Sequence, residues 1–279
     1  MLRGLYRTFV FGHFWLGSGA AMQAWSTWWV LDLGPVPKRA LLFVALATVS
    51  AYGFMRGMRI MDAVSGADHL DWLRRHRSGL WTLTGLSAVL SSWCLWEAEP
   101  DLFLLLAALV PAVLLYVTPW TQGRGGLRSV PLFKVVLIAA VWAAMVVLVP
   151  ILFVTSTVPA GGVLLVAERF FFLMAITLPF DIRDLPTEPL KWTFPGYFGI
   201  CTTKLFALIA LALSFSILFA VSHEGFLWWS FLPGYMLVAW LIAKARAGAQ
   251  GPYYSFWLDG TLVFVPLISV LLTTAFGNN

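Results

Sequence analysis

The chain has 279 residues, of which 60% are hydrophobic and only 11% are charged, and its mean hydropathy is +0.85. Because a soluble domain carries roughly a quarter charged residues, this composition excludes an ordinary soluble protein. In a membrane protein, lysine and arginine mostly report topology, so the net charge of +5 does not indicate binding to nucleic acid.

Apolar runs of membrane-spanning length recur from one end of the chain to the other. We expect an all-α membrane protein in which residues 1–279 form one domain, with nine transmembrane helices around a central cavity open to the cytoplasm. The first run has no convincing cleavage site and is read as a retained helix. The expected spans are Phe9–Leu33, Ala40–Met61, Gly79–Trp96, Leu102–Trp120, Val130–Thr155, Gly161–Phe180, Gly196–Ser222, Leu227–Ala245 and Tyr253–Phe276.

The charges of the short connections separate into two groups in this layout. If the N-terminus is cytoplasmic, the same side receives the basic residues Arg74, Arg75, Arg77, Arg124, Arg128, Lys244 and Arg246. The other side receives mainly acidic residues, and only Lys38 and Arg39 break the rule. Basic residues in short loops set orientation. We therefore predict a multi-pass protein with a cytoplasmic N-terminus and a C-terminus on the opposite side.

The most informative local pattern is acidic and follows the sixth span. Asp181, Asp184 and Glu188 lie at spacings i, i+3 and i+7. Carboxylates are costly near hydrocarbon, so they are candidate functional groups there. The spacing puts Asp181 and Asp184 on one helical face, and Pro186 then ends the helix. Clustered oxygen ligands beside a membrane suit Mg²⁺ that holds a phosphorylated substrate.

Other charged residues lie inside the expected spans. Lys134, Lys204 and Asp259 are a few residues from cytoplasmic ends, on the order of 6–12 Å deep at about 1.5 Å per residue. Charges at this depth on several helices predict a polar cavity, although a lysine near a helix end also reaches the interface by snorkelling. Glu168 and Arg169 lie deeper. Since adjacent helix residues do not face each other, we expect each to have a partner on another helix.

The stretch from Phe180 to Pro195 resembles the second aspartate-rich motif of the UbiA superfamily of intramembrane prenyltransferases. That motif reads roughly Asn-Asp-x-x-Asp-x-x-x-Asp, followed by a Lys-Thr-Leu-Pro-like run. The matching positions, with one inserted residue in the run, are Asp181, Asp184, Glu188, Lys191, Thr193 and Pro195. The nine expected spans and the cytoplasmic placement of the motif are also similar to that family.

The first motif of the family closes its second helix, and here the chain departs from it. Gly53 and Phe54 stand where Asn and Asp are expected, and Asp62 is out of register. Arg56 and Arg59, spaced i and i+3, can share one face and bind phosphate through their planar forks. The other interpretation is that both are ordinary inside-facing charges at a helix end.

The resemblance implies an enzyme that transfers a prenyl group from an isoprenyl diphosphate to an acceptor. It implies Mg²⁺ held by Asp181, Asp184 and Glu188, with charge on the diphosphate offset by Lys191, Arg56 and Arg59. Tyr52 either faces the developing cation or packs in the core. The remaining candidates for substrate binding are Lys134, Lys204 and Asp259.

Two alternatives stay open on the sequence alone. The incomplete first motif favours a protein of the same fold that binds an isoprenoid lipid without catalysis. The buried charges Lys134, Lys204, Glu168 and Arg169 permit a transporter of a small anion. In each case membrane lipids surround the protein, and the expected ligand is an isoprenyl diphosphate, another isoprenoid lipid or a small anion.

Overall fold

A computed structural model describes residues 2–59, 68–117, 131–186, 193–221, 228–248 and 252–276, and every regular element within these ranges is helical. Apolar segments in hydrocarbon favour helices because a helix satisfies its own backbone donors and acceptors. The helices are α1 (Leu2–Phe11), α2 (Phe14–Val30), α3 (Lys38–Arg59), α4 (Asp68–Arg75), α5 (Arg77–Cys94), α6 (Pro100–Val117), α7 (Pro131–Ala143), α8 (Val149–Leu152), α9 (Ala160–Asp184), α10 (Phe194–Val221), α11 (Leu232–Lys244) and α12 (Asp259–Phe276). Short 3₁₀ segments are η1 (Leu95–Glu97) and η5 (Trp228–Phe231), and π-helical segments are η3 (Ala144–Leu148) and η6 (Tyr253–Leu258).

Each expected span coincides with a helical segment, with local differences. The first span is broken into α1 and α2 at His13, whose φ of 64° lies in the left-handed region. The connection after α3 contains the short helix α4, which the sequence interpretation left without structure. Among the described residues, five helical segments are long and apolar enough to cross a membrane, so the count of nine stays a prediction. These five are Lys38–Met58, Phe133–Leu152, Ala160–Asp184, Phe194–Val221 and Tyr253–Phe276.

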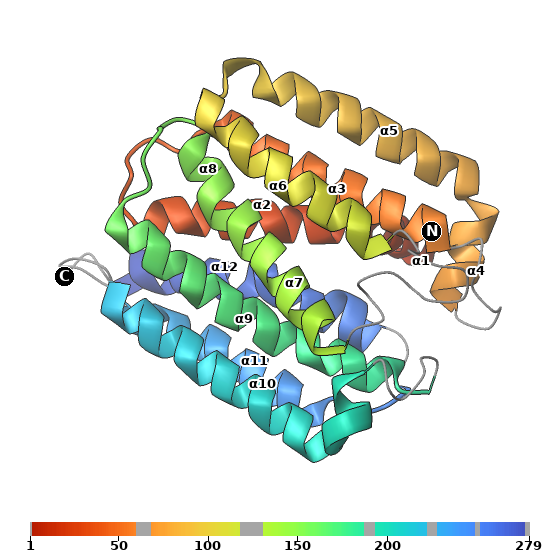
Figure 1. Cartoon of the computed structure of the whole chain (residues 1–279). Coiled ribbons are helices and arrows are strands. Elements are labelled where there is room, and N and C mark those ends of the chain that lie inside the picture. The colour runs from red at the N-terminus through yellow and green to blue at the C-terminus, as the bar shows by residue number, and fades with distance from the viewer. Residues whose placement is uncertain are drawn as a thin grey trace.

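The long helices lie side by side in one bundle (Figure 1). Helix α9 packs against α7 and α10, and α2 packs between α3 and α12. Fully buried alanines, including Ala20, Ala139 and Ala207, allow neighbouring helices to approach closely, as is typical of membrane bundles. Helix α1 begins at one end of the bundle and α12 finishes at the other (Figure 1). The last turns of α3 and α9 and the first turn of α7 lie at the same end of the bundle as the start of α1 (Figure 1).

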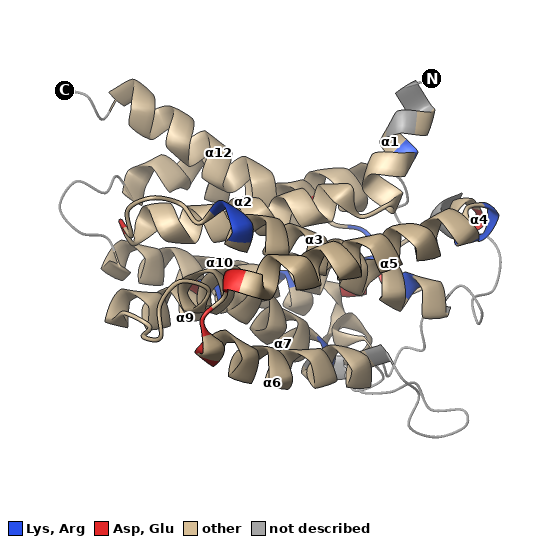
Figure 2. Cartoon of the chain, turned by 90° about the horizontal axis from the view of Figure 1, so that it is seen from above, with Lys and Arg blue, Asp and Glu red and all other residues tan. Residues whose placement is uncertain are grey.

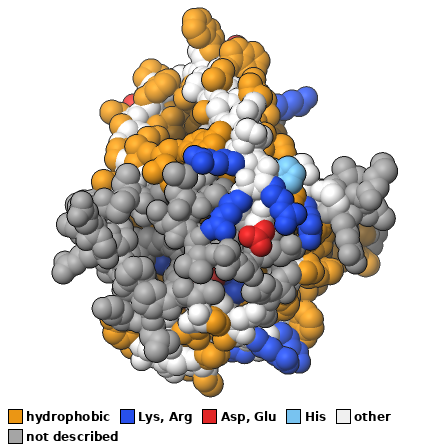
Figure 3. Space-filling view, turned by 90° about the vertical axis from the view of Figure 1, so that its right-hand side faces the viewer, with side chains coloured by type: hydrophobic (Ala, Val, Ile, Leu, Met, Phe, Trp, Pro, Cys, Tyr) orange, Lys and Arg blue, Asp and Glu red, His pale blue; other side chains and the backbone are white. Residues whose placement is uncertain are grey.

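The charges follow this arrangement. Figure 2 shows long helical stretches without charged residues. Lysine, arginine, aspartate and glutamate lie mainly near the ends of individual helices. Figure 3 looks onto the end that carries α4, where basic side chains gather among apolar flanks. At the opposite end Arg39, one of the two exceptions to the charge rule, forms an ion pair with Glu97. The exceptional charge is thus balanced by a local acid.

Candidate functional site

Charged side chains from four helices come together near the end of the bundle at which α9 finishes. They are Arg56 on α3, Lys134 on α7, Asp181, Arg183 and Asp184 on α9, and Asp259 at the start of α12. We refer to these six residues as the charge cluster. It holds three cationic and three acidic side chains, and it brings together five of the residues that the sequence predicted for the site.

The most buried part of the charge cluster is an ion pair between α7 and α9. The Lys134 Nζ lies 2.7 Å from the Asp181 Oδ1, and the side chains are only 6% and 1% exposed. The other carboxylate oxygen, Oδ2, accepts a hydrogen bond of 3.1 Å from the backbone N–H of Phe194, the first residue of α10. Asp181 therefore also stabilises the start of α10, where unpaired N–H groups favour a negative charge.

A second ion pair lies at the last turn of α9. The Arg183 Nε lies 2.7 Å from the Asp184 Oδ1, and Nη2 lies 3.2 Å from Oδ2, so the guanidinium grips the carboxylate with two donors. The guanidinium carbon also lies 4.8 Å from the ring centre of Phe180 and 5.5 Å from that of Tyr254. Such contacts favour a cation over the aromatic face and fix the orientation of Arg183.

Arg56 and Asp259 join the two ion pairs electrostatically. Arg56 lies within electrostatic range of Asp184 and of Asp259, and Asp259 lies within range of Arg183. Asp259 directly follows the π-helical segment η6, an irregularity that is frequent at functional sites. The cluster is thus one connected set of charges rather than two separate pairs.

Tyr52 borders the charge cluster on the apolar side. Its hydroxyl accepts a hydrogen bond of 3.0 Å from the indole N–H of Trp142, and its ring centre lies 5.8 Å from that of His13. Tyr52 also lies within electrostatic range of Arg56 and Asp259. The aromatic groups Tyr52 and Trp142 therefore lie next to the charges, at the transition to the apolar core.

Besides Tyr52, four of the predicted site residues are not placed in the charge cluster. Lys204 donates a hydrogen bond of 2.7 Å to the carbonyl oxygen of Ala243, at the C-terminal turn of α11. This is the usual preference of a lysine for the last carbonyl groups of a helix. Glu188, Lys191 and the side chain of Arg59 lie outside the described residues, so their roles stay predictions.

The positions of the missing first motif serve packing between α3 and α5. A Cβ atom at Gly53 would lie 2.2 Å from the Thr84 Oγ1, so a larger residue cannot enter without a shift of its neighbours. The ring of Phe54 packs edge-on against Trp81, with 6.1 Å between ring centres. Within α3, therefore, Gly53 and Phe54 contact α5, whereas Tyr52 and Arg56 belong to the face near the charge cluster.

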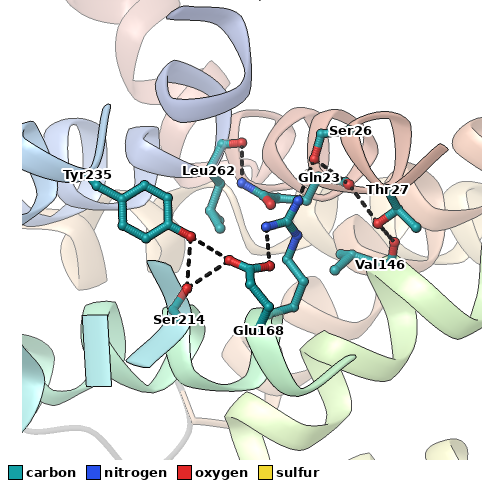
Figure 4. Close-up of polar contacts among 9 residues, drawn as sticks. Gln23, Ser26, Thr27, Val146, Glu168, Ser214, Tyr235 and Leu262 are labelled. Atoms are coloured by element: carbon teal, nitrogen blue, oxygen red, sulfur yellow. Dashed lines mark hydrogen bonds and ion pairs between the residues drawn. The ribbon is translucent and has the colours of Figure 1, made fainter. Parts of the chain in front are cut away.

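A second polar group lies deep in the core (Figure 4). Glu168 and Arg169 are fully buried and form an ion pair with each other, which the sequence interpretation had excluded because they are adjacent. Figure 4 shows Glu168 reaching from α9 towards Ser214 and Tyr235 on the neighbouring helices. Glu168 also accepts hydrogen bonds from Ser214 at 2.7 Å and from the Tyr235 hydroxyl. Arg169 donates to the Ser26 Oγ at 2.8 Å. The expected partners on other helices are thus present as well.

Arg183, Trp142 and His13 were not predicted as site residues. Arg183 lies between the two aspartates in the sequence. Its long side chain turns back to Asp184, as Arg169 does to Glu168. An arginine directly beside an acid at a membrane depth was the available signal. Trp142 and His13 carry no such signal, because their roles depend on packing between distant helices.

Comparison with known proteins identifies the architecture. No protein-family model matches the sequence, and no curated protein matches it. Two solved structures of a UbiA homolog from Archaeoglobus fulgidus are similar over most of the chain. The structure bound to GPP and Mg²⁺ has a TM-score of 0.59 and covers 95% of this chain and 99% of its own. The structure bound to DMAPP and Mg²⁺ has a TM-score of 0.61 and covers 97% and 99%.

The chain has the UbiA fold. The fold implied by the resemblance of the second motif is thereby confirmed. Sequence identity to both structures is 11%, so the likeness describes the architecture and not the chemistry. The UbiA fold, with its long apolar helices, makes this an integral membrane protein.

The described carboxylates of the charge cluster do not fit a magnesium site as they stand. Mg²⁺ needs carboxylate oxygens at close, regular positions around the ion. The Asp181 Oδ1 forms an ion pair with Lys134 without accepting a hydrogen bond, and Oδ2 accepts one from the Phe194 N–H. Both oxygens of Asp184 accept hydrogen bonds from Arg183. Among the residues that the structure describes, no group of three or more acidic, histidine or cysteine side chains is arranged to hold a metal ion.

Proposed function

We propose that this protein binds an isoprenyl diphosphate, with its phosphate groups at the charge cluster and its prenyl chain among the apolar helices. We further propose that it transfers the prenyl group to an acceptor, as an intramembrane prenyltransferase. The observation that carries the proposal is the convergence of Arg56, Lys134 and Arg183 at one end of a UbiA fold. Arginine and lysine are the side chains that bind phosphate oxygens most strongly.

The chemistry would proceed by departure of the diphosphate. When the bond between the first prenyl carbon and the phosphate oxygen breaks, both bonding electrons leave with the diphosphate. The acceptor then forms a bond to this carbon and releases a proton. Arg56, Lys134 and Arg183 would counter the negative charge that grows on the leaving oxygen. The faces of Tyr52 and Trp142 would stabilise the allylic cation.

The orientation in the membrane belongs to the same proposal. We propose that the end with the charge cluster faces the cytoplasm, with the N-terminus on that side, the C-terminus opposite and residues 1–279 as one domain. Single cysteines introduced at Arg75 and at Glu97, with Cys94 and Cys201 replaced, test this. A membrane-impermeant reagent added to intact cells should label position 97 and not position 75. The reverse labelling would contradict the orientation.

A second candidate is binding of an isoprenoid lipid without catalysis. It is favoured by the ion pairs that occupy Asp181 and Asp184, since these carboxylates are not displayed as open ligands. The transport hypothesis rested on isolated buried charges. Lys134, Lys204, Glu168 and Arg169 all have partners within the protein, so no specific observation favours transport.

The test is binding and turnover of geranyl diphosphate by the purified protein in lipid nanodiscs. Lys134→Met should weaken binding by about tenfold or more, because it removes a charged donor to phosphate. Lys244→Met should bind normally, because Lys244 is an exposed lysine at the same end of the bundle. Release of diphosphate with formation of a prenylated lipid supports transfer. Binding without any product supports the non-catalytic candidate, and absence of binding contradicts both.

A further inference from the structure

Two cations of the charge cluster form ion pairs with the carboxylates that would have to bind a metal ion. Asp181 is held from both sides, by the Lys134 ammonium at 2.7 Å and by the Phe194 N–H at 3.1 Å. A metal ion at this carboxylate would have to displace a buried lysine or release the start of α10. Since the Lys134 side chain is only 6% exposed, displacement would leave its charge in an apolar environment.

Asp184 is held equally firmly. Two nitrogens of Arg183 bind its two oxygens, and the guanidinium lies against the rings of Phe180 and Tyr254. The backbone carbonyl of Arg183 also accepts a hydrogen bond of 3.2 Å from the N–H of Gly248. Arg183 is therefore held by Asp184, by the two aromatic rings and by Gly248. Its guanidinium is already in position to donate hydrogen bonds to the Asp184 carboxylate.

The described part of α3 that packs on α5 leaves no room for a larger residue at Gly53 or Gly57. Gly53 is pressed against Thr84, and Gly57, one turn further along α3, is pressed against Trp81, where a Cβ atom would lie 2.6 Å from the ring. A carboxylate at position 53 would disturb the packing of α3 on α5. The face of α3 that belongs to the cluster presents Arg56 instead.

We infer that the charge cluster binds the phosphate groups of an isoprenyl diphosphate through Lys134, Arg183 and Arg56, without a divalent metal ion. This inference rests on the proposed function. An ammonium carries three donors and a guanidinium five, so each group can donate to more than one acceptor. Lys134 and Arg183 can each hold a carboxylate on one side and a phosphate oxygen on the other. Each cationic side chain would thus bridge a carboxylate and a phosphate, which is the role that a bound metal ion has between the same two groups.

The experiment measures binding rather than turnover. Isothermal titration of the protein in nanodiscs with geranyl thiodiphosphate, which resists ionisation, is run with EDTA and then with Mg²⁺. The two dissociation constants should agree within about threefold. Lys134→Met should weaken binding in EDTA by about tenfold or more, because it removes a charged donor to phosphate. Lys244→Met should match the unchanged protein, and Lys134→Arg should recover most of the affinity.

A second variant distinguishes loss of binding from loss of stability. Lys134→Met alone leaves Asp181 buried and unpaired, whereas Lys134→Met with Asp181→Asn removes both charges and keeps an oxygen for the Phe194 N–H. This double variant should be as stable to unfolding as the unchanged protein. It should still bind geranyl thiodiphosphate more weakly than the unchanged protein does. Binding that requires Mg²⁺, or binding in EDTA that is indifferent to Lys134, overturns the inference and leaves the proposed function standing. Absence of binding under both conditions overturns the proposed function itself.

Discussion

The buried pair of Glu168 and Arg169 gives the sharpest test of the packing of this bundle. We consider Glu168→Gln, which keeps the size of the side chain and an oxygen that can accept from Ser214 and Tyr235. It removes the negative charge that faces the Arg169 guanidinium. Since Glu168 is 0% and Arg169 2% exposed, water cannot compensate the arginine. The variant therefore measures the contribution of the Glu168 charge to stability separately from that of its hydrogen bonds.

The magnitude follows from the burial of the pair. Removal of one partner of a buried ion pair costs about 3–5 kcal/mol, because the other charge stays buried and uncompensated. Hydrogen bonds between membrane helices contribute less, about 0.6 kcal/mol on average. We predict that Glu168→Gln lowers the free energy of unfolding by about 3 kcal/mol, and Arg169→Met by a similar amount. The double variant should cost at least about 2 kcal/mol less than the sum, because it leaves no unpaired charge.

The assay is reversible unfolding in mixed micelles, followed by tryptophan fluorescence. Ser214→Ala, which removes a donor to Glu168, should cost about 1 kcal/mol, whereas Ser216→Ala on the exposed side of α10 should cost almost nothing. Additive costs of the two charge variants, or a cost of Glu168→Gln below about 1 kcal/mol, would refute the reasoning.

Three further variants test the local geometry by the same unfolding assay. Gly53→Asp, which restores an acid close to the first motif, should destabilise the protein by about 1–3 kcal/mol, because its Cβ meets Thr84; a neutral effect would contradict the packing of α3 on α5. Gly199→Ala should cost about 1–3 kcal/mol, since φ is 79° and ψ 161° although space is open around it; unchanged stability would show that the α10 break adapts. Tyr52→Phe should cost about 1–3 kcal/mol by leaving the Trp142 N–H unpaired, with a shift in tryptophan emission; an unchanged spectrum would count against that bond.

The fold was largely predictable because it depends on properties that a sequence displays. Long apolar runs identify helices, and Pro186 predicted where the helix that carries Asp181 and Asp184 ends, beyond the expected sixth span Gly161–Phe180. The structure ends α9 at Asp184 and confirms the UbiA fold. The break at His13 was not visible, because a single left-handed residue leaves the apolar composition of the span unchanged.

The candidate site was predictable in its location and less so in its pairing. The depth of Lys134 and Asp259 indicated a polar region, and both residues belong to the charge cluster. That Lys134 binds Asp181 could not be read from the sequence, because 47 positions separate them and the register of α7 against α9 is set by packing. Lys204 has the same sequence signature and instead caps α11.

The most direct test of the proposed function is a structure of the protein with geranyl thiodiphosphate, determined in lipid nanodiscs both with EDTA and with Mg²⁺. The account predicts density for the two phosphate groups among Arg56, Lys134 and Arg183, with the prenyl chain running past Tyr52 into the bundle. The phosphate density should be present in EDTA and unchanged by Mg²⁺. Phosphate groups bound elsewhere on the protein would contradict the account.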